Sequence, residues 1–290
     1  MSDILGRRRG RTAATTSRRL RVGSLPISTA LAIAVLALMA LCAVFDGLAH
    51  EPGRINALES LQGPSGDHYL GTDQLGRDIF ARIIAGARTS LLGPTLLALG
   101  VAVIGAVVAM LAGYFGGRID AVVSRVVDVL YSIPALMVAI ILVGVTGGGF
   151  AMTVVILTVF NLPLAVRNLR AAVMERAHLP YMEAARTLGM PTWRILLTHL
   201  LPVIAPFVMA TFFLQFTYGV VELSSLSFLG LGVPPGAPDW GRMVADNRAS
   251  MFGNAWATAA PAIAIVALAV STNLIGEWIN DRYEKAGKAR

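Results

Sequence analysis

Side chains with the type and spacing that catalysis or metal binding needs are few in this sequence. The single cysteine, Cys42, lies in an apolar run, and the four histidines form no HExxH or other metal-ligand spacing. The sequence also lacks a GxxxxGK[ST] phosphate-binding loop and a GxSxG nucleophile motif. We therefore expect a non-catalytic chain that has no metal or cofactor of its own and cannot hydrolyse ATP alone.

One polar segment has the residue types for binding another protein. It runs from Arg167 to Pro202, lies between two very apolar stretches and is rich in Arg and Glu. Good helix formers such as Ala184 and Ala185 occur in both halves, and Gly189-Met190-Pro191 interrupts the segment in the middle. The pattern predicts two helices joined by a turn, placed in water beside the membrane and in contact with a partner there.

The composition is that of a membrane protein. Of the 290 residues, 56% are hydrophobic and only 14% are charged, whereas soluble domains are near one quarter charged. The net charge of +7 does not indicate a nucleic-acid partner, because 7 of the 24 Lys and Arg residues lie within the first 21 positions. Such clustering beside an apolar run instead sets membrane topology.

Apolar runs long enough to cross a bilayer predict an all-α fold with six transmembrane helices. Residues 129–166 are uncharged, but one helix of that length would be about 57 Å long, so the glycines at 144–149 should mark a turn between two spans. The remaining spans are expected near 22–45, 89–117, 203–221 and 257–276. In the second of these, four glycines should let other helices approach closely: Gly93, Gly100, Gly105 and Gly113.

The amino-terminal region is expected to be a membrane anchor behind a basic tail. Ser17-Arg18-Arg19 weakly resembles a twin-arginine signal, but the apolar run Val22–Phe45 is longer than the apolar part of a signal peptide. A retained helix is therefore the better interpretation than a cleaved signal.

The polar stretch before the second span should contain a short amphipathic helix on the membrane surface. Asp73 is a plausible N-cap, and Leu75, Ile79 and Ile83 form one apolar stripe at helical spacing. We leave open whether the stretch Gly71–Asp78 has this structural role alone or also contacts another protein.

The distribution of basic residues predicts the sidedness. With the amino terminus in the cytosol, 18 of the 24 Lys and Arg residues fall on the cytosolic side, while acidic residues divide almost evenly. Both termini and residues 167–202 are then cytosolic. The expected order is a basic tail (1–21), a first transmembrane helix (22–48), an external loop with an amphipathic helix (49–88), a five-helix core (89–277) that includes an external loop (222–256), and a cytosolic tail (278–290).

The predicted spans hold few ionisable residues, namely Asp46, His199 and Glu222 near their expected ends. Ion-coupled carriers usually keep acidic or histidine side chains inside the bilayer to bind the coupling ion. A secondary carrier or channel is therefore disfavoured, and the energy for any transport should enter through the cytosolic segment 167–202.

The residues of this segment resemble the EAA motif of ABC importer permeases. Glu183-Ala184-Ala185, Gly189 and Leu201-Pro202 match it in spacing, and His199 stands where the general motif has Ile, as in the peptide and nickel branch. GTDQLGRD (71–78) and LSFLGLGV with PDWG (226–241) are similar to the C-type permease subunits of dipeptide and oligopeptide importers. The resemblance covers about three quarters of the chain.

This resemblance implies a type I ABC importer permease fold and a set of partners. The partners would be a second, homologous permease, two cytosolic ATPases that bind ATP and Mg, and an extracytoplasmic solute-binding protein. The chain would lie in a bacterial plasma (inner) membrane and transport di- or oligopeptides, with nickel or another small solute as the alternative. A membrane scaffold protein is a further rival, although that role would not explain the motif spacing.

The resemblance also implies roles for particular residues. Those that couple to the ATPase would be Glu183, Ala184, Ala185, Gly189, Leu201 and Pro202. A second set has a possible contact with the solute-binding protein, and its alternative roles are a turn before a capped amphipathic helix for the first four residues and an interfacial aromatic anchor for the last: Asp73, Gly76, Arg77, Asp78 and Trp240.

Overall fold

The computed structural model describes residues 26–45 and 52–288, and the secondary structure of these residues is helical apart from one isolated bridge between Thr72 and Asp78. The predicted basic tail (1–21), both ends of the predicted first span (22–48) and the last two residues lie outside the described residues. The long helices are α1 (Ile27–Val44), α2 (Ile79–Phe115), α3 (Gly117–Tyr131), α4 (Ala135–Thr146), α5 (Phe150–Ala177), α8 (Leu201–Phe228) and α10 (Trp256–Lys288). Short helices η2 (Ala57–Glu59), α6 (Pro180–Thr187), α7 (Thr192–Ile195), η3 (Leu196–Leu200), α9 (Trp240–Asn247) and η4 (Arg248–Ser250) lie between them.

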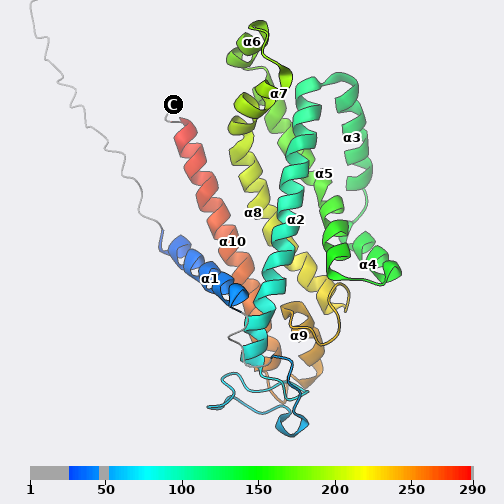
Figure 1. Ribbon diagram of the computed structural model, residues 1–290, viewed down its shortest axis with the longest axis vertical. Coiled ribbons are helices and arrows are strands. Elements are labelled where there is room, and N and C mark those ends of the chain that lie inside the picture. The colour runs from blue at the N-terminus through cyan, green and yellow to red at the C-terminus, as the bar shows by residue number, and fades with distance from the viewer. Residues whose placement is uncertain (1–25, 46–51, 289–290) are drawn as a thin grey trace, which may run out of the picture.

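The described helices provide up to six membrane spans. Five are long and apolar enough to cross a bilayer, and the pair α3 and α4, bent by 77°, makes a sixth if it counts as one broken span. Figure 1 shows an elongated bundle, with α6 and α7 at one end and α9 with the 52–78 loop at the other. We call these the α6 end and the α9 end.

Helix α2 lies at the centre of the bundle, packed against α5 and α8. Small residues make this packing close, as predicted. A Cβ atom added to Gly100 would lie 2.9 Å from Thr158, and one added to Gly113 would lie 2.6 Å from Val173. Lipid chains are as apolar as leucine, so association of spans depends on such close packing rather than on the hydrophobic effect.

The expectation of a separate amphipathic helix before the second span is wrong. Helix α2 begins at Ile79 and continues without interruption to Phe115, so the predicted surface helix is the first part of the span itself. Its N-cap is Asp78, which accepts a hydrogen bond from the backbone N–H of Ala81. Asp73 cannot cap this helix, because its Oδ1 atom accepts the backbone N–H groups of Leu75 and Arg77 within the preceding loop.

The charged residues between the second predicted span and residue 129 belong to an amphipathic helix, α3. The chain bends between Tyr131 and Ala135, where Pro134 disfavours helical geometry in the residue before it. The predicted turn at 144–149 is present: α4 ends at Thr146, and three glycines with positive φ lead into α5.

Two helices extend beyond the carboxyl-terminal ends of their predicted spans. Helix α8 extends to Phe228, so the predicted loop at 222–256 begins later and contains α9. Helix α10 runs to Lys288, so almost all of the predicted tail at 278–290 is helical. Helix α8 ends just before Gly230, whose φ of +82° is typical of the residue that follows a helix.

Candidate functional site

The predicted polar segment lies at the α6 end of the bundle. Its first third is the end of α5, and α6 and α7 then project beyond the long helices (Figure 1). Gly189 forms the turn between α6 and α7, with a φ of +71° and open space around its Cα. Only glycine adopts this left-handed geometry without strain, so the predicted break has a conformational cause.

Helix α6 has one buried and one exposed face. Met182 and Ala185 are buried in a cluster with Leu169, Ile195 and Leu200. The side chains of Glu183 and Ala184 lie on the exposed face. Of the residues that the motif singles out here, Ala185 therefore positions the helix, while Glu183 and Ala184 are available to a partner.

Two exposed apolar residues beside the turn were missed by sequence reasoning. Leu188 is 84% exposed and Trp193 is 63% exposed, on either side of Gly189. The sequence does contain a signal for them, namely a large apolar residue at each edge of a break inside a polar segment. Apolar side chains of this size at the tip of an aqueous projection are typical of a surface that another protein covers.

Basic residues connect this segment to the long helices. The Arg186 guanidinium stacks 4.4 Å from the ring centroid of Tyr114 at the end of α2, and its Nε donates a hydrogen bond of 3.1 Å to the Tyr114 hydroxyl. Arg176 of α5 stacks in the same way on Phe207 of α8. The first contact joins α6 to the end of α2, and the second joins α5 to α8.

The last two motif residues lie where the segment joins α8. Residues Leu196–Leu200 form a π-helix, η3, and the backbone N–H of Leu201 bonds to the carbonyl of Leu196. Pro202 has no backbone N–H and so cannot donate the hydrogen bond that a residue at this position of an α-helix normally makes. The helix can therefore adopt the wider π-helical turn just before Pro202. Leu201 and Pro202 thus mark an irregular joint between the segment and the span.

A buried charge cluster occupies the α9 end. The Nε atom of Arg77 donates to Asp73 Oδ2 at 2.7 Å, and Arg82 Nε lies 3.9 Å from the same carboxylate oxygen. The guanidinium of Arg82 also donates to the backbone carbonyls of Pro52, Gly236 and Ala237. All three charged side chains are buried, and together they connect the 52–78 loop to the loop before α9.

Trp240 lies inside this end of the bundle. Its indole Nε1 donates a 2.9 Å hydrogen bond to the carbonyl of Ile83, and its ring packs on Gly86 of α2. Gly76 is tightly enclosed, because an added Cβ would lie 1.8 Å from the carbonyl oxygen of Asn56. The burial of Asp73, Arg77 and Trp240 favours the structural interpretation of these residues, and contact with a solute-binding protein remains a prediction for the surrounding loops.

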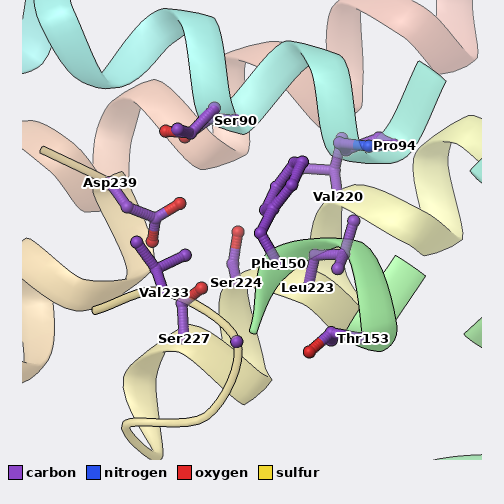
Figure 2. Close-up of a pocket in the computed structure, with 12 residues that line it drawn as sticks. Ser90, Pro94, Phe150, Thr153, Val220, Leu223, Ser224, Ser227, Val233 and Asp239 are labelled. Atoms are coloured by element: carbon purple, nitrogen blue, oxygen red, sulfur yellow. The ribbon is translucent and has the colours of Figure 1, made fainter. Parts of the chain in front are cut away.

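A small pocket with both apolar and polar lining lies beside Asp239, between α2, α5, α8 and the loop before α9 (Figure 2). The side chain of Asp239 and the hydroxyls of Ser90, Ser224 and Ser227 line it. Burial raises the pKa of Asp239, and hydrogen bonds from the Arg242 backbone and the Ser227 hydroxyl act in the opposite direction. The space of about 10 Å³ is room for about one water molecule, which is too small for a transported solute.

The ion pair of His68 with Asp78 makes the α9 end sensitive to pH. His68 Nδ1 lies 2.7 Å from Asp78 Oδ2, and this hydrogen bond raises the pKa of His68 above its ordinary value of 6.5. The protonated ring therefore stabilises the fold below about pH 6.5, and this stability is lost as the pH rises through the folded-state pKa. We expect the melting temperature in detergent to fall from pH 6 to pH 8, and His68→Gln to reduce that fall. An equal fall in the variant would contradict the assignment.

Comparison with known proteins identifies the family. Residues 103–285 match the family described as "Binding-protein-dependent transport system inner membrane component". The glutathione transport system permease protein GsiD of Pectobacterium atrosepticum is 36% identical over 220 residues, which cover 76% of this chain and 73% of that protein. The dipeptide transport system permease protein DppC of Alkalihalophilus pseudofirmus is 33% identical, covering 81% and 77%. The probable D,D-dipeptide transport system permease protein DdpC of Escherichia coli is 31% identical, covering 87% and 86%.

A solved structure shows the same fold. The MetNI methionine ABC transporter, in an inward-facing conformation, contains a chain that matches with a TM-score of 0.56 over 68% of this chain and 94% of that one, at 21% identity. This confirms the expected all-α, type I ABC importer permease fold. The chain belongs to the family of binding-protein-dependent transport system inner membrane components, as a multi-pass permease.

Proposed function

We propose that this chain is one of two permease subunits of an ATP-driven importer for short peptides, and that α6 and α7 dock on a cytosolic ATPase. The observation that carries the proposal is the exposed surface of Leu188, Trp193, Glu183 and Ala184 at the tip of a segment that projects beyond the spans. A surface that is both apolar and acidic suits a groove with apolar walls and a basic residue at its edge.

The α6 end faces the cytosol in this proposal, because the basic residues gather there. Helix α3 with Arg118 and Arg125, and the segment 167–202 with its five arginines, lie toward that end, as does the end of α10 (Figure 1). The α9 end would then face a solute-binding protein outside the membrane. The positive-inside rule supports this orientation.

The transport mechanism would be alternating access. Closure of the ATPase pair on ATP and Mg would move α6 and α7, and the Arg186–Tyr114 contact would pass this motion to α2 at the centre of the bundle. ATP can shift the permeases between two states only if the ATPases bind those states with different affinity. In this mechanism the chain forms part of the translocation path and changes conformation, and it makes or breaks no covalent bond.

The relatives favour peptides as the solute. Their names give glutathione, dipeptides and D,D-dipeptides as the transported compounds, and all three are peptides or peptide-like molecules. Among the described residues, no group of three or more His, Cys, Asp and Glu side chains is placed to hold a metal ion, which gives nickel no evident binding site in this chain alone.

Co-purification tests the proposed assembly. The tagged chain, expressed with the second permease and ATPases encoded beside it and extracted in mild detergent, should retain both ATPases. Proteoliposomes containing this complex and its binding protein should accumulate a radiolabelled dipeptide only when ATP is supplied. Failure to retain an ATPase under any condition would refute the importer, whereas accumulation of nickel but not dipeptide would refute only the substrate.

A further inference from the structure

Helices α5 and α8 bring a carboxylate and a carboxamide together in the middle of the bundle. The Nδ2 atom of Asn161 donates to Glu222 Oε2 at 2.8 Å and to the carbonyl of Leu157 at 3.0 Å. Glu222 lies inside α8, which continues to Phe228, and not at the end of its span as the sequence suggested. Among the described residues, no Lys or Arg forms an ion pair with Glu222.

The contacts of α2 place this pair at the depth of the hydrocarbon. The uncharged part of α2 begins at Thr89, and its Gly93 packs on Leu223, the residue after Glu222. Farther along α2, Gly100 packs on Thr158 and Gly105 on Ala165, which places Asn161 between these two levels. A charged side chain at this depth is costly when it faces lipid, and such residues usually face a water-filled path or a partner.

Other polar residues lie on the same side of α8 as the partly buried Glu222. Thr211, Tyr218, Glu222 and Ser225 follow one another at spacings of seven, four and three residues, which places them on one side of α8. The hydroxyls of Thr211 and Ser225 bond only to carbonyls of their own helix. On α5, Asn168 is exposed one heptad after Asn161. The carboxylate of Glu222 cannot be satisfied by a helix carbonyl, because an ionised carboxylate has no donor, so this side of α8 favours water or a polar solute beside Glu222.

The groups that remain free on the pair are hydrogen-bond acceptors. The amide nitrogen of Asn161 is occupied by its two acceptors, which leaves its Oδ1 atom, and one oxygen of the Glu222 carboxylate also remains. The nearby Tyr218 hydroxyl can accept a third bond. A site with one negative charge and several acceptors suits an ammonium group, which carries three N–H donors and a positive charge.

We propose that Glu222, positioned by Asn161, binds the amino-terminal ammonium group of a peptide as it passes through the path between the two permeases. This proposal rests on the proposed function, because it requires a transported peptide to bring its amino terminus to this depth. The rival occupant is a basic side chain of the second permease, and the experiment below separates the two.

The test measures ATP-driven uptake by proteoliposomes that contain the full importer and its binding protein. Glu222→Gln keeps the size of the side chain and removes its charge. Uptake of a dipeptide with a free amino terminus should fall about tenfold, since a charge-assisted hydrogen bond is lost. For the N-acetylated dipeptide, uptake by Glu222→Gln should equal uptake by the wild type. The variant complex should also be recovered in the same amount as the wild-type complex.

Glu277→Gln is a matched control. Glu277 is also a carboxylate that accepts a hydrogen bond from an Asn side chain, Asn273, but on the exposed surface of α10. This variant should take up both dipeptides like the wild type.

Three outcomes would overturn the proposal. They are unchanged uptake of the free dipeptide by Glu222→Gln, equal losses for the free and acetylated dipeptides, and loss of the second permease from the purified complex. The last would show that Glu222 pairs with a cation of that subunit. If the wild-type importer takes up neither dipeptide, the proposed function itself fails.

Discussion

Leu188→Asp is expected to abolish dipeptide uptake while the chain still enters the membrane in normal amount. The side chain of Leu188 is 84% exposed, so the substitution disturbs no packing within this chain. In the proposed complex it would bury an unpaired charge beside Trp193 at the ATPase surface. Losing a central apolar contact typically costs an interface 2 kcal/mol or more, which is roughly a 30-fold loss of affinity.

The measurement pairs two quantities, the amount of ATPase retained by the tagged chain and the initial rate of ATP-driven uptake. Leu58→Asp is the matched control, because Leu58 is even more exposed and lies at the α9 end, far from α6. The control should retain the ATPase like the wild type, whereas Leu188→Asp should lose most of the ATPase and most of the uptake. Equal behaviour of the two variants would show that Leu188 is not part of the docking surface.

Asp73→Ala is expected to destabilise the α9 end more than any other single change in its loop. Removing this carboxylate leaves the guanidinium of Arg77 without its ion pair and deprives the buried Arg82 of its nearest negative charge. Removing one partner of a buried pair typically costs about 3–5 kcal/mol. The melting temperature should fall by about 10 °C if the unfolding entropy resembles that of a soluble protein of similar size.

Thermal unfolding in detergent, followed by circular dichroism or by a thiol-reactive dye on Cys42, measures this effect. Asp67→Ala is the control, since Asp67 lies on the same loop and is exposed. Its melting temperature should change by less than a few degrees, in line with the usual effect of surface substitutions. If both variants melt at the same temperature, the buried cluster contributes nothing to stability.

The number of spans, the turn at 144–149 and the break at Gly189 were predictable because each depends on local sequence. A run of about 20 apolar residues must cross the bilayer as a helix, which alone satisfies every backbone polar group there. Glycines with positive φ likewise act on their own turn. The family was predictable for a similar reason, since its motifs are short runs of adjacent residues.

Helix boundaries and the exposure of single residues were not predictable in the same way. The apolar run ends at Val221, but α8 continues to Phe228 because its last turns pack on α9 and α2. Ala184 and Ala185 are identical in type and adjacent in sequence, and only the cluster around Met182 makes one buried and the other exposed. Such differences depend on neighbours that are distant in the chain.

The sequence by itself determined that this is a membrane permease with a polar projection between two spans, because hydropathy, charge distribution and motif spacing are properties of the chain alone. Only the tertiary structure decided that Asp73, Arg77 and Trp240 are buried, that Leu188 and Trp193 are exposed, and that Asn161 meets Glu222 across two helices. Burial and pairing depend on which helices lie side by side, and in a membrane this is decided by close packing rather than by hydrophobicity.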